Sequence, residues 1–175
     1  MERQRGVAAG VAASHPVTAE VGVQTLRAGG TAADAAVAAV LTCCVAETIY
    51  TGLGGGGFAT YFEAATGEVT CLDFFTAVPG TDGDRQPGPM VGVDVFFGGM
   101  PQVYSIGGAS VAVPGVPAGV GEVHRRWGRL PWSDVGAPAA ACSTCGARWR
   151  SGCRDRPPSP ARWRWPRCWS RSPSR

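Results

Sequence analysis

The chain of 175 residues contains neither lysine nor asparagine, and all 16 of its basic residues are arginine. Lys and Asn have A-rich codons, whereas Gly, Pro, Ala and Arg have G/C-rich ones. The absence of Lys and Asn is therefore typical of a GC-rich gene and says little about selection on charge. No run of about 18 apolar residues occurs, and we expect no transmembrane helix. A hydrophobic content of 45% excludes a wholly disordered chain, and the length predicts one ordinary domain.

The seven cysteines lack the even number and regular spacing of a secreted disulfide scaffold. The weakly basic start leads into a run of small apolar residues that is shorter and poorer in leucine than the core of a signal peptide. We therefore expect a cytoplasmic protein. In it, residues 6–13 form a buried strand, and Cys43, Cys44 and Cys71 are small buried hydrophobic residues.

Charge is distributed unevenly along the chain. Residues 1–140 carry 7 Arg against 12 acidic residues, whereas residues 141–175 carry 9 Arg against Asp155 alone. The second segment has no Leu, Ile, Val, Phe, Met or Tyr, so it cannot build an ordinary core. Back-translation with G or C at most third codon positions, read one base earlier, turns residues 142–151 and 162–170 into Ala/Leu-rich helical sequences. We predict that residues 141–175 are a frameshifted, disordered Arg/Pro/Trp-rich tail.

This tail admits two other interpretations. Cys142 and Cys145 have the spacing of a pair of zinc ligands, but Cys153 and Cys168 lack the short spacing of a second pair, and we expect no metal site. Arg interleaved with Trp, as in residues 162–165, suits phosphate contacts and base stacking. A small binding protein with a basic, nucleic-acid-contacting tail is the alternative function, although we expect no specific nucleic-acid partner.

Residues 1–140 predict an α+β arrangement that begins with two helices. The first is marked by apolar residues at helical spacing, namely Ala19, Val23 and Leu26. Gly29 and Gly30 end it. Thr31 and Asp34 form a capping box for a second helix over 32–45, which is nearly all Ala, Val and Leu and should be buried on most sides.

Alternating residues over 58–63 and 68–74, separated by a turn, predict a β-hairpin. Further along we expect a loop over 79–109, a short strand over 110–113, a helix over 114–127 and another helix from Trp132.

Four consecutive glycines, Gly54, Gly55, Gly56 and Gly57, precede the hairpin. Such a run indicates either positive φ angles or a close approach to the backbone, so we predict a structural glycine loop. It is not a phosphate loop, because no Gly-Lys-Ser/Thr follows. It is not a dinucleotide fingerprint either, because it leads into a strand instead of opening a helix. We expect no cofactor.

Three polar side chains remain as candidates for chemistry. His15 precedes a proline and should satisfy a local backbone group, and His124 should lie on a helix surface. No Gly-x-Ser-x-Gly element accompanies either histidine. Asp73 is either an orienting carboxylate or an exposed acid at the end of a strand.

Three motifs, in this order and spacing, are similar to the N-terminal part of the γ-glutamyltransferase (glutathione hydrolase) family. They are residues 10–16 running into 28–38, residues 52–58, and residues 113–119 continuing to 128–132. The resemblance covers about residues 6–140. It implies an incomplete N-terminal-nucleophile hydrolase, that is, part of an α/β/β/α sandwich made as a precursor that cuts itself into two subunits.

The resemblance also implies a mechanism. The nucleophile is the N-terminal Thr of the small subunit, and its own α-amine, with a pKa of roughly 7.7–8, is the base. The Thr attacks a small-molecule γ-glutamyl amide to form an acyl-enzyme, which then reacts with water or an amino acid. This chain has no counterpart of that Thr, so we expect no catalytic residue in it. Without its small subunit it should be inactive, and we expect no membrane partner.

One departure concerns substrate binding. The family places an Arg two residues after the strand-end Asp, where it binds the α-carboxylate of the substrate. Here Asp73 is followed by Phe74 and Phe75, so that Phe75 occupies the Arg position. A phenyl ring cannot replace a bidentate guanidinium group. The parent enzyme therefore takes a different acyl donor or binds the carboxylate from elsewhere, for which Arg85 is a nearby candidate.

Overall fold

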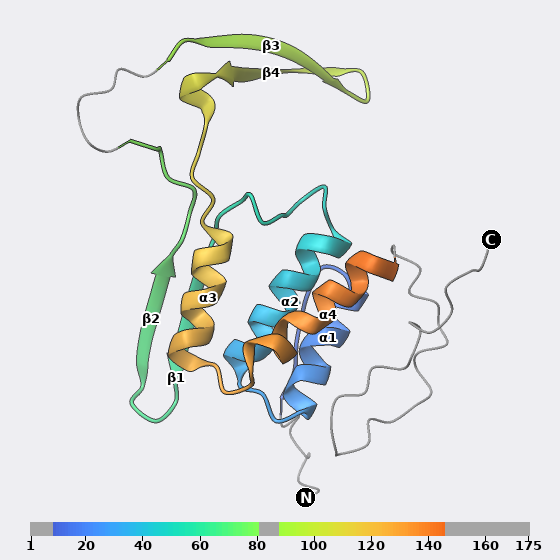
Figure 1. Ribbon diagram of the computed structural model, residues 1–175, viewed down its shortest axis with the longest axis vertical. Coiled ribbons are helices and arrows are strands. Elements are labelled where there is room, and N and C mark those ends of the chain that lie inside the picture. Colours follow the sequence, from blue (N-terminus) through green and yellow to red (C-terminus); the bar gives the residue numbers. More distant parts are fainter. Residues whose placement is uncertain (1–8, 81–87, 146–175) are drawn as a thin grey trace, which may run out of the picture. The chain divides into compact units, whose positions relative to one another are not determined.

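The computed structural model describes residues 9–80 and 88–145 (Figure 1). The chain divides into two compact units. Unit 1 runs up to Gly52 and resumes at Val120, and unit 2 is Leu53–Gly119. The elements are α1 (Pro16–Arg27), α2 (Ala32–Ala46), β1 (Phe58–Glu63), β2 (Glu68–Asp73), β3 (Met90–Phe97), β4 (Met100–Gly107), the 3-10 turn η1 (Gly108–Ser110), α3 (Val116–Trp127) and α4 (Trp132–Cys145). This is the α+β class expected from the sequence. The prediction of a disordered tail from residue 141 is wrong for residues 141–145, which form the end of α4, and residues 146–175 lie outside the described part of the chain.

In unit 1, α2 packs against both α1 and α4. The buried face of α1 consists of small residues, namely Val17, Thr18, Val21, Gly22 and Thr25. The predicted face of Ala19, Val23 and Leu26 is only half-buried. Small side chains allow close approach of two helices, and the Thr25 hydroxyl is satisfied inside its own helix, where it donates to the Val21 carbonyl at 2.9 Å.

Residues 9–13 do not form the strand predicted for 6–13, whose first three residues lie outside the described part of the chain. Among residues 9–13 only Val11 is partly buried, and it packs against Gly22, where an added Cβ would lie 2.7 Å from Val11 Cγ1. A strand needs a neighbour for its backbone groups, and every strand in the described residues belongs to unit 2.

The second helix begins as predicted, with a complete capping box formed by Thr31 and Asp34. Its first two turns are buried on most sides, and Ala32, Ala36 and Val40 are its exposed residues up to position 40. None of the helices among the described residues is long and apolar enough to cross a membrane.

The Asp34 carboxylate joins α2 to the turn between α3 and α4. Its side chain is 0% exposed and accepts hydrogen bonds from the backbone N–H groups of Thr31 (2.8 Å), Arg129 (3.0 Å) and Leu130 (3.3 Å). The Thr31 hydroxyl in turn donates to the Trp127 carbonyl at 2.8 Å. Burial raises the pKa of Asp34, but these donors together outweigh it and hold the pKa below its usual value.

His124 is not on the helix surface, contrary to the prediction. Its Nε2 lies 2.9 Å from the Leu130 carbonyl and 3.6 Å from Asp34 Oδ1, and its ring meets Trp132 edge-on at 5.2 Å between centroids. A Cβ at Gly128 would lie 2.5 Å from the His124 carbonyl and 2.9 Å from Asp34 Oδ1. The turn therefore closes tightly because residue 128 is glycine.

Unit 2 contains two antiparallel hairpins. The predicted hairpin is present as β1–β2, in the register Phe58↔Asp73 to Glu63↔Glu68. The second hairpin, β3–β4, lies where the sequence analysis expected only a loop. Its turn residues Gly98 and Gly99 have φ angles of +56° and +87°, as a two-residue hairpin turn requires.

Two smaller expectations are wrong in unit 2. The strand expected over 110–113 is reduced to one isolated bridge between Val113 and Ala77, because the preceding residues form η1. Cys71 is exposed, because it lies on the outward face of the β1–β2 hairpin opposite Thr60. Cys43 and Cys44 are half-buried.

Replacing the Asp34 carboxylate tests its role in joining α2 to the turn between α3 and α4. Asp34→Asn should lower the free energy of unfolding by about 2–3 kcal/mol, because buried N–H donors lose a charged acceptor. Urea unfolding followed by helical circular dichroism measures the change. Asp94→Asn, at an exposed site on β3, is the control and should change stability by less than about 0.5 kcal/mol.

The difference in unfolding free energy between the wild type and Asp34→Asn should depend on pH. Since folding lowers the pKa of Asp34, its contribution is present above the unfolded pKa of about 3.9 and is lost as pH falls through the folded pKa. The stability gap between the wild type and Asp34→Asn should therefore shrink on acidification. A gap that stays constant from neutral pH to below both pKa values would contradict this role.

Candidate functional site

The glycine loop, the end of β2 and the start of α3 meet within unit 2. We call this the glycine-loop junction and define it as residues 53–57, 73–77 and 113–116. Gly57 and Phe74 exchange backbone hydrogen bonds of 3.3 and 3.0 Å. The Gly55 carbonyl accepts from the N–H groups of Gly115 at 2.9 Å and Val116 at 3.0 Å, so it ties the loop to the first turn of α3.

Close approach, and not positive φ, accounts for glycine in this loop. None of the four glycines is among the residues with positive φ. At Gly56 an added Cβ would lie 2.7 Å from Phe75 Cα, and at Gly57 it would lie 3.1 Å from the Phe74 ring. Gly54 has open space around it. The chain passes too close to the backbone after β2 for a side chain at Gly56, and a side chain at Gly57 would make a tight contact with the Phe74 ring.

Phe74 is the residue around which the junction packs. A Cβ at Gly115 would overlap the Phe74 carbonyl, and a Cβ at Gly119 would overlap the Phe74 ring. Glycines on two separate segments, before β1 and in α3, therefore leave room for the same aromatic residue. This relation could not be read from either segment alone.

Asp73 is exposed and accepts a hydrogen bond from the Phe75 N–H at 2.9 Å. It thus fixes the local turn after β2, which is the role of a strand-end acid. Phe75 itself is 60% exposed and stacks on Phe58, with 5.7 Å between ring centroids and 15° between ring planes. An aromatic pair therefore occupies the position where the family resemblance implies a carboxylate-binding Arg. Arg85 lies outside the described residues.

A second polar cluster, missed by the sequence analysis, lies in unit 1. Glu47 Oε2 accepts from the Ser14 hydroxyl at 2.9 Å and from Cys43 Sγ at 3.0 Å. Burial, followed by the neighbouring Glu47, raises the pKa of Cys43 to about 11. The thiol is therefore a neutral hydrogen-bond donor at neutral pH and not an activated nucleophile.

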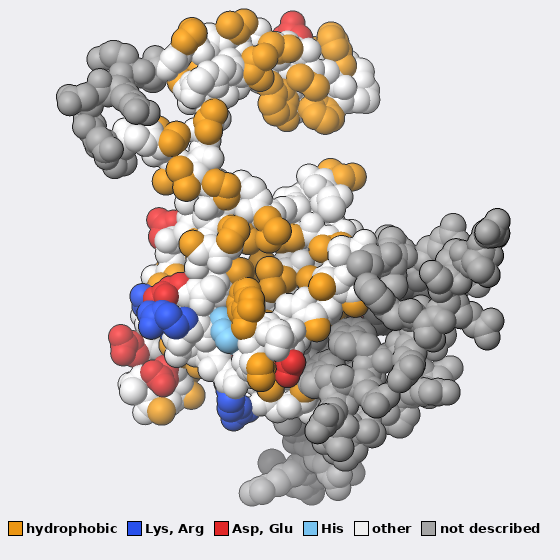
Figure 2. All heavy atoms as spheres, viewed as in Figure 1, with side chains coloured by type: hydrophobic (Ala, Val, Ile, Leu, Met, Phe, Trp, Pro, Cys, Tyr) orange, Lys and Arg blue, Asp and Glu red, His pale blue; other side chains and the backbone are white. Residues whose placement is uncertain are grey.

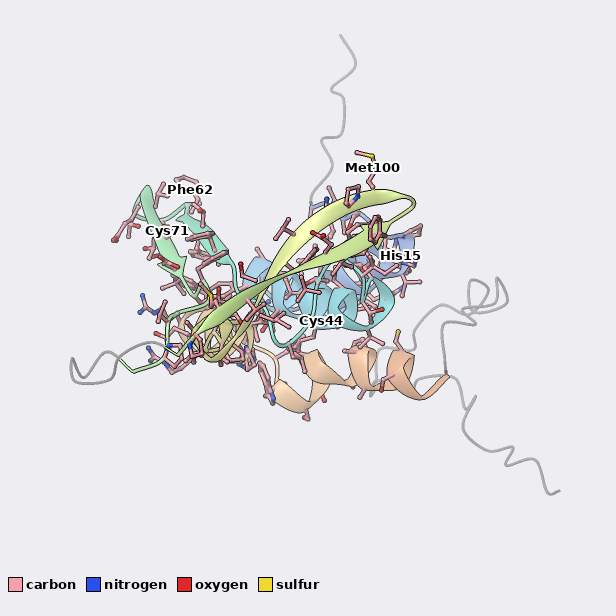
Figure 3. All side chains as sticks on the ribbon, turned by 90° about the horizontal axis from the view of Figure 1, so that it is seen from above. His15, Cys44, Phe62, Cys71 and Met100 are labelled. Carbon is pink, nitrogen blue, oxygen red and sulfur yellow. The ribbon has the colours of Figure 1, made fainter. Side chains whose placement is uncertain are left out.

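The remaining candidates have structural roles. His15 Nδ1 accepts from the Val17 N–H at 3.2 Å and caps α1, as expected for a histidine that satisfies local backbone. Figure 3 labels His15 and Cys44 beside the helices, and Phe62 and Cys71 on the β1–β2 hairpin. In the described part of the chain no group of three His, Cys, Asp or Glu residues could hold a metal ion. Cys153 and Cys168 lie outside that part.

The packing of the glycine loop can be tested at two neighbouring positions. Gly56→Ala should destabilise the junction by about 1–3 kcal/mol, because the methyl group would meet backbone atoms that cannot rotate away. Gly54→Ala, in open space and without a positive φ, should be neutral or slightly stabilising.

Amide hydrogen exchange at Gly115 and Val116, which donate to Gly55, reads out the junction directly. We expect faster exchange in Gly56→Ala and unchanged exchange in Gly54→Ala. Equal protection of these two amides in both variants would show that close approach does not determine the loop.

Comparison with known proteins extends this description. The family model described as Gamma-glutamyltranspeptidase matches residues 18–153. Glutathione hydrolase 3 of Arabidopsis thaliana is 32% identical over 139 residues, which are 79% of this chain and 20% of that protein. The glutathione hydrolase proenzyme of Pseudomonas aeruginosa is 34% identical over 129 residues, covering 74% and 22%.

Solved structures agree. The γ-glutamyltranspeptidase from Pseudomonas nitroreducens complexed with L-DON has a TM-score of 0.59 and 30% identity, covering 77% of this chain and 38% of that chain. The Bacillus anthracis transpeptidase CapD has a TM-score of 0.58 and 26% identity, covering 78% and 38%. The chain spans about a fifth of the length of these curated relatives. The segment that matches the family model covers most of the chain and runs through both units. The chain therefore belongs to the γ-glutamyltranspeptidase family.

Proposed function

We propose that this chain is the N-terminal, large-subunit portion of a γ-glutamyltransferase-like hydrolase. The complete protein would hydrolyse or transfer γ-glutamyl groups through an N-terminal Thr supplied by the small subunit. The observation that carries this proposal is the family match over residues 18–153. Relatives named as glutathione hydrolases support glutathione-like amides as the substrate class.

In this proposal the chain supplies scaffold and part of the substrate surface. The glycine-loop junction fixes the end of β2 against α3 through backbone hydrogen bonds, and so holds Phe75 in an exposed position. The attacking Thr and the oxyanion donors come from the remainder of the enzyme. We further propose a cytoplasmic location, no cofactor, and a tail from residue 141 that results from a shifted reading frame.

The proposal predicts that the chain alone is inactive. Incubated with a chromogenic γ-glutamyl anilide, the purified chain should release no more chromophore than a heat-treated control, because it lacks a nucleophile. A gene whose frame is shifted back by one base near codon 141, and which extends through the downstream region, should give a self-cleaving, active protein. Turnover by the chain alone, or a restored protein without activity on any γ-glutamyl amide, would contradict the proposal.

Phe75 predicts weak γ-glutamyl recognition in the restored enzyme. A charge-assisted hydrogen bond contributes about 1.5–3 kcal/mol, so Phe75→Arg should lower KM for glutathione by tenfold or more. Phe62→Arg, on β1 and outside the junction, adds the same charge and should leave KM unchanged. Efficient glutathione hydrolysis by the wild type with no gain in Phe75→Arg would refute this assignment of Phe75.

A further inference from the structure

The β3–β4 hairpin has two chemically different faces. Paired residues of an antiparallel hairpin lie on the same side, so the register assigns each side chain to a face. One face consists of Val91, Val93, Val95, Phe97, Met100, Gln102, Tyr104 and Ile106. We call it the uncharged face. The other face is mixed, with Asp94, Ser105, two glycines and a proline among its members.

The uncharged face is largely open to solvent. Its apolar members other than the half-buried Val95 are between 37% and 70% exposed. Hydrophobic side chains gather along this hairpin in Figure 2, and Figure 3 shows Met100 projecting from the region of its turn. Within the described residues β3 and β4 pack mainly against each other and against η1. An isolated two-stranded hairpin is marginally stable in water, so this face needs a partner surface.

We infer that two copies of this chain associate through their uncharged faces, forming a small two-layer sheet about a two-fold axis. Near the axis of a two-fold interface each side chain meets its own copy, so a charge at that place would meet a like charge. This face carries no Asp, Glu, Lys, Arg or His. It therefore meets the first requirement for self-association.

Gln102 supplies the second argument. It is the one amide on the uncharged face and is exposed, and its pair with Val95 is the third of eight counted from the turn. A primary amide carries both donors and an acceptor, so it can pair with an identical amide across a two-fold axis. A carboxylate or an ammonium group at this site could not pair with its own copy. The axis therefore lies near Gln102.

The size of the face sets the strength of the contact. Strands of eight residues span about 26 Å, and a two-stranded face is about 10 Å wide with its side chains. Each face has a projected area of about 260 Å², so two faces in contact bury between about 500 and 1,000 Å² of accessible surface, less than a standard specific interface. The dimer should therefore be weak and should depend on protein concentration.

Sedimentation velocity of the full chain, in reductant so that its cysteines cannot cross-link, tests the inference. The wild type should shift from monomer to dimer as concentration rises. Gln102→Glu, which keeps the shape of the side chain but places two carboxylates together, should raise the dimer Kd by about tenfold or more at neutral pH. Ile106→Glu, which places a charge on the same apolar face, should also weaken the dimer.

Two variants add the same charge elsewhere and serve as controls. Ser105→Glu lies on the opposite face of β4, and Val69→Glu lies on the exposed apolar face of the β1–β2 hairpin. Both should dimerise like the wild type, and circular dichroism checks that all variants keep their fold. A wild type that stays monomeric, a Gln102→Glu protein that dimerises normally, or a control that dissociates equally would overturn the inference.

Discussion

A buried carboxylate organises unit 1. Asp34 lies one turn into α2, yet it accepts hydrogen bonds from Arg129 and Leu130, nearly a hundred residues later in the chain. The α3–α4 turn would otherwise leave these part-buried N–H groups without a protein acceptor, and a donor removed from water without a partner is costly. The close fit of Gly128 and the contact of His124 with the same turn both follow from this arrangement. The helix that follows this turn, α4, packs on α2.

Unit 2 is held by a different principle, close approach of backbone to backbone. The glycine loop, the strand end at Phe74 and the first turn of α3 approach so closely that glycine is required at Gly56 and Gly115. This leaves Phe75 on the surface, stacked on Phe58. The glycine run thus has a structural explanation. The surface next to it is apolar and aromatic, because Phe58 and Phe75 stack there.

Local signals in the sequence predicted local structure well. The capping box at Thr31, the glycine stop after α1, the β1–β2 hairpin and the starts of α3 and α4 all depend on a few adjacent residues. The β3–β4 hairpin was also readable, because alternating valines lead into Gly98 and Gly99, but the surrounding glycines and prolines suggested a loop. Long-range packing was not readable. The buried face of α1 and the position of His124 depend on which distant segment packs there.

The two units differ in how far they bury their own apolar residues. Unit 1 contains nearly all the buried hydrophobic residues, among them Val21, Val37 and Val135, whereas unit 2 contributes Val116 alone within the described residues. Ordering a chain costs about 1–2 kcal/mol per residue in backbone entropy, which burial of apolar area must offset. Hairpins whose valines and phenylalanines remain exposed cannot provide this from within. Unit 2 therefore gains less stability from its own apolar burial than unit 1, whose helices bury much of their apolar surface.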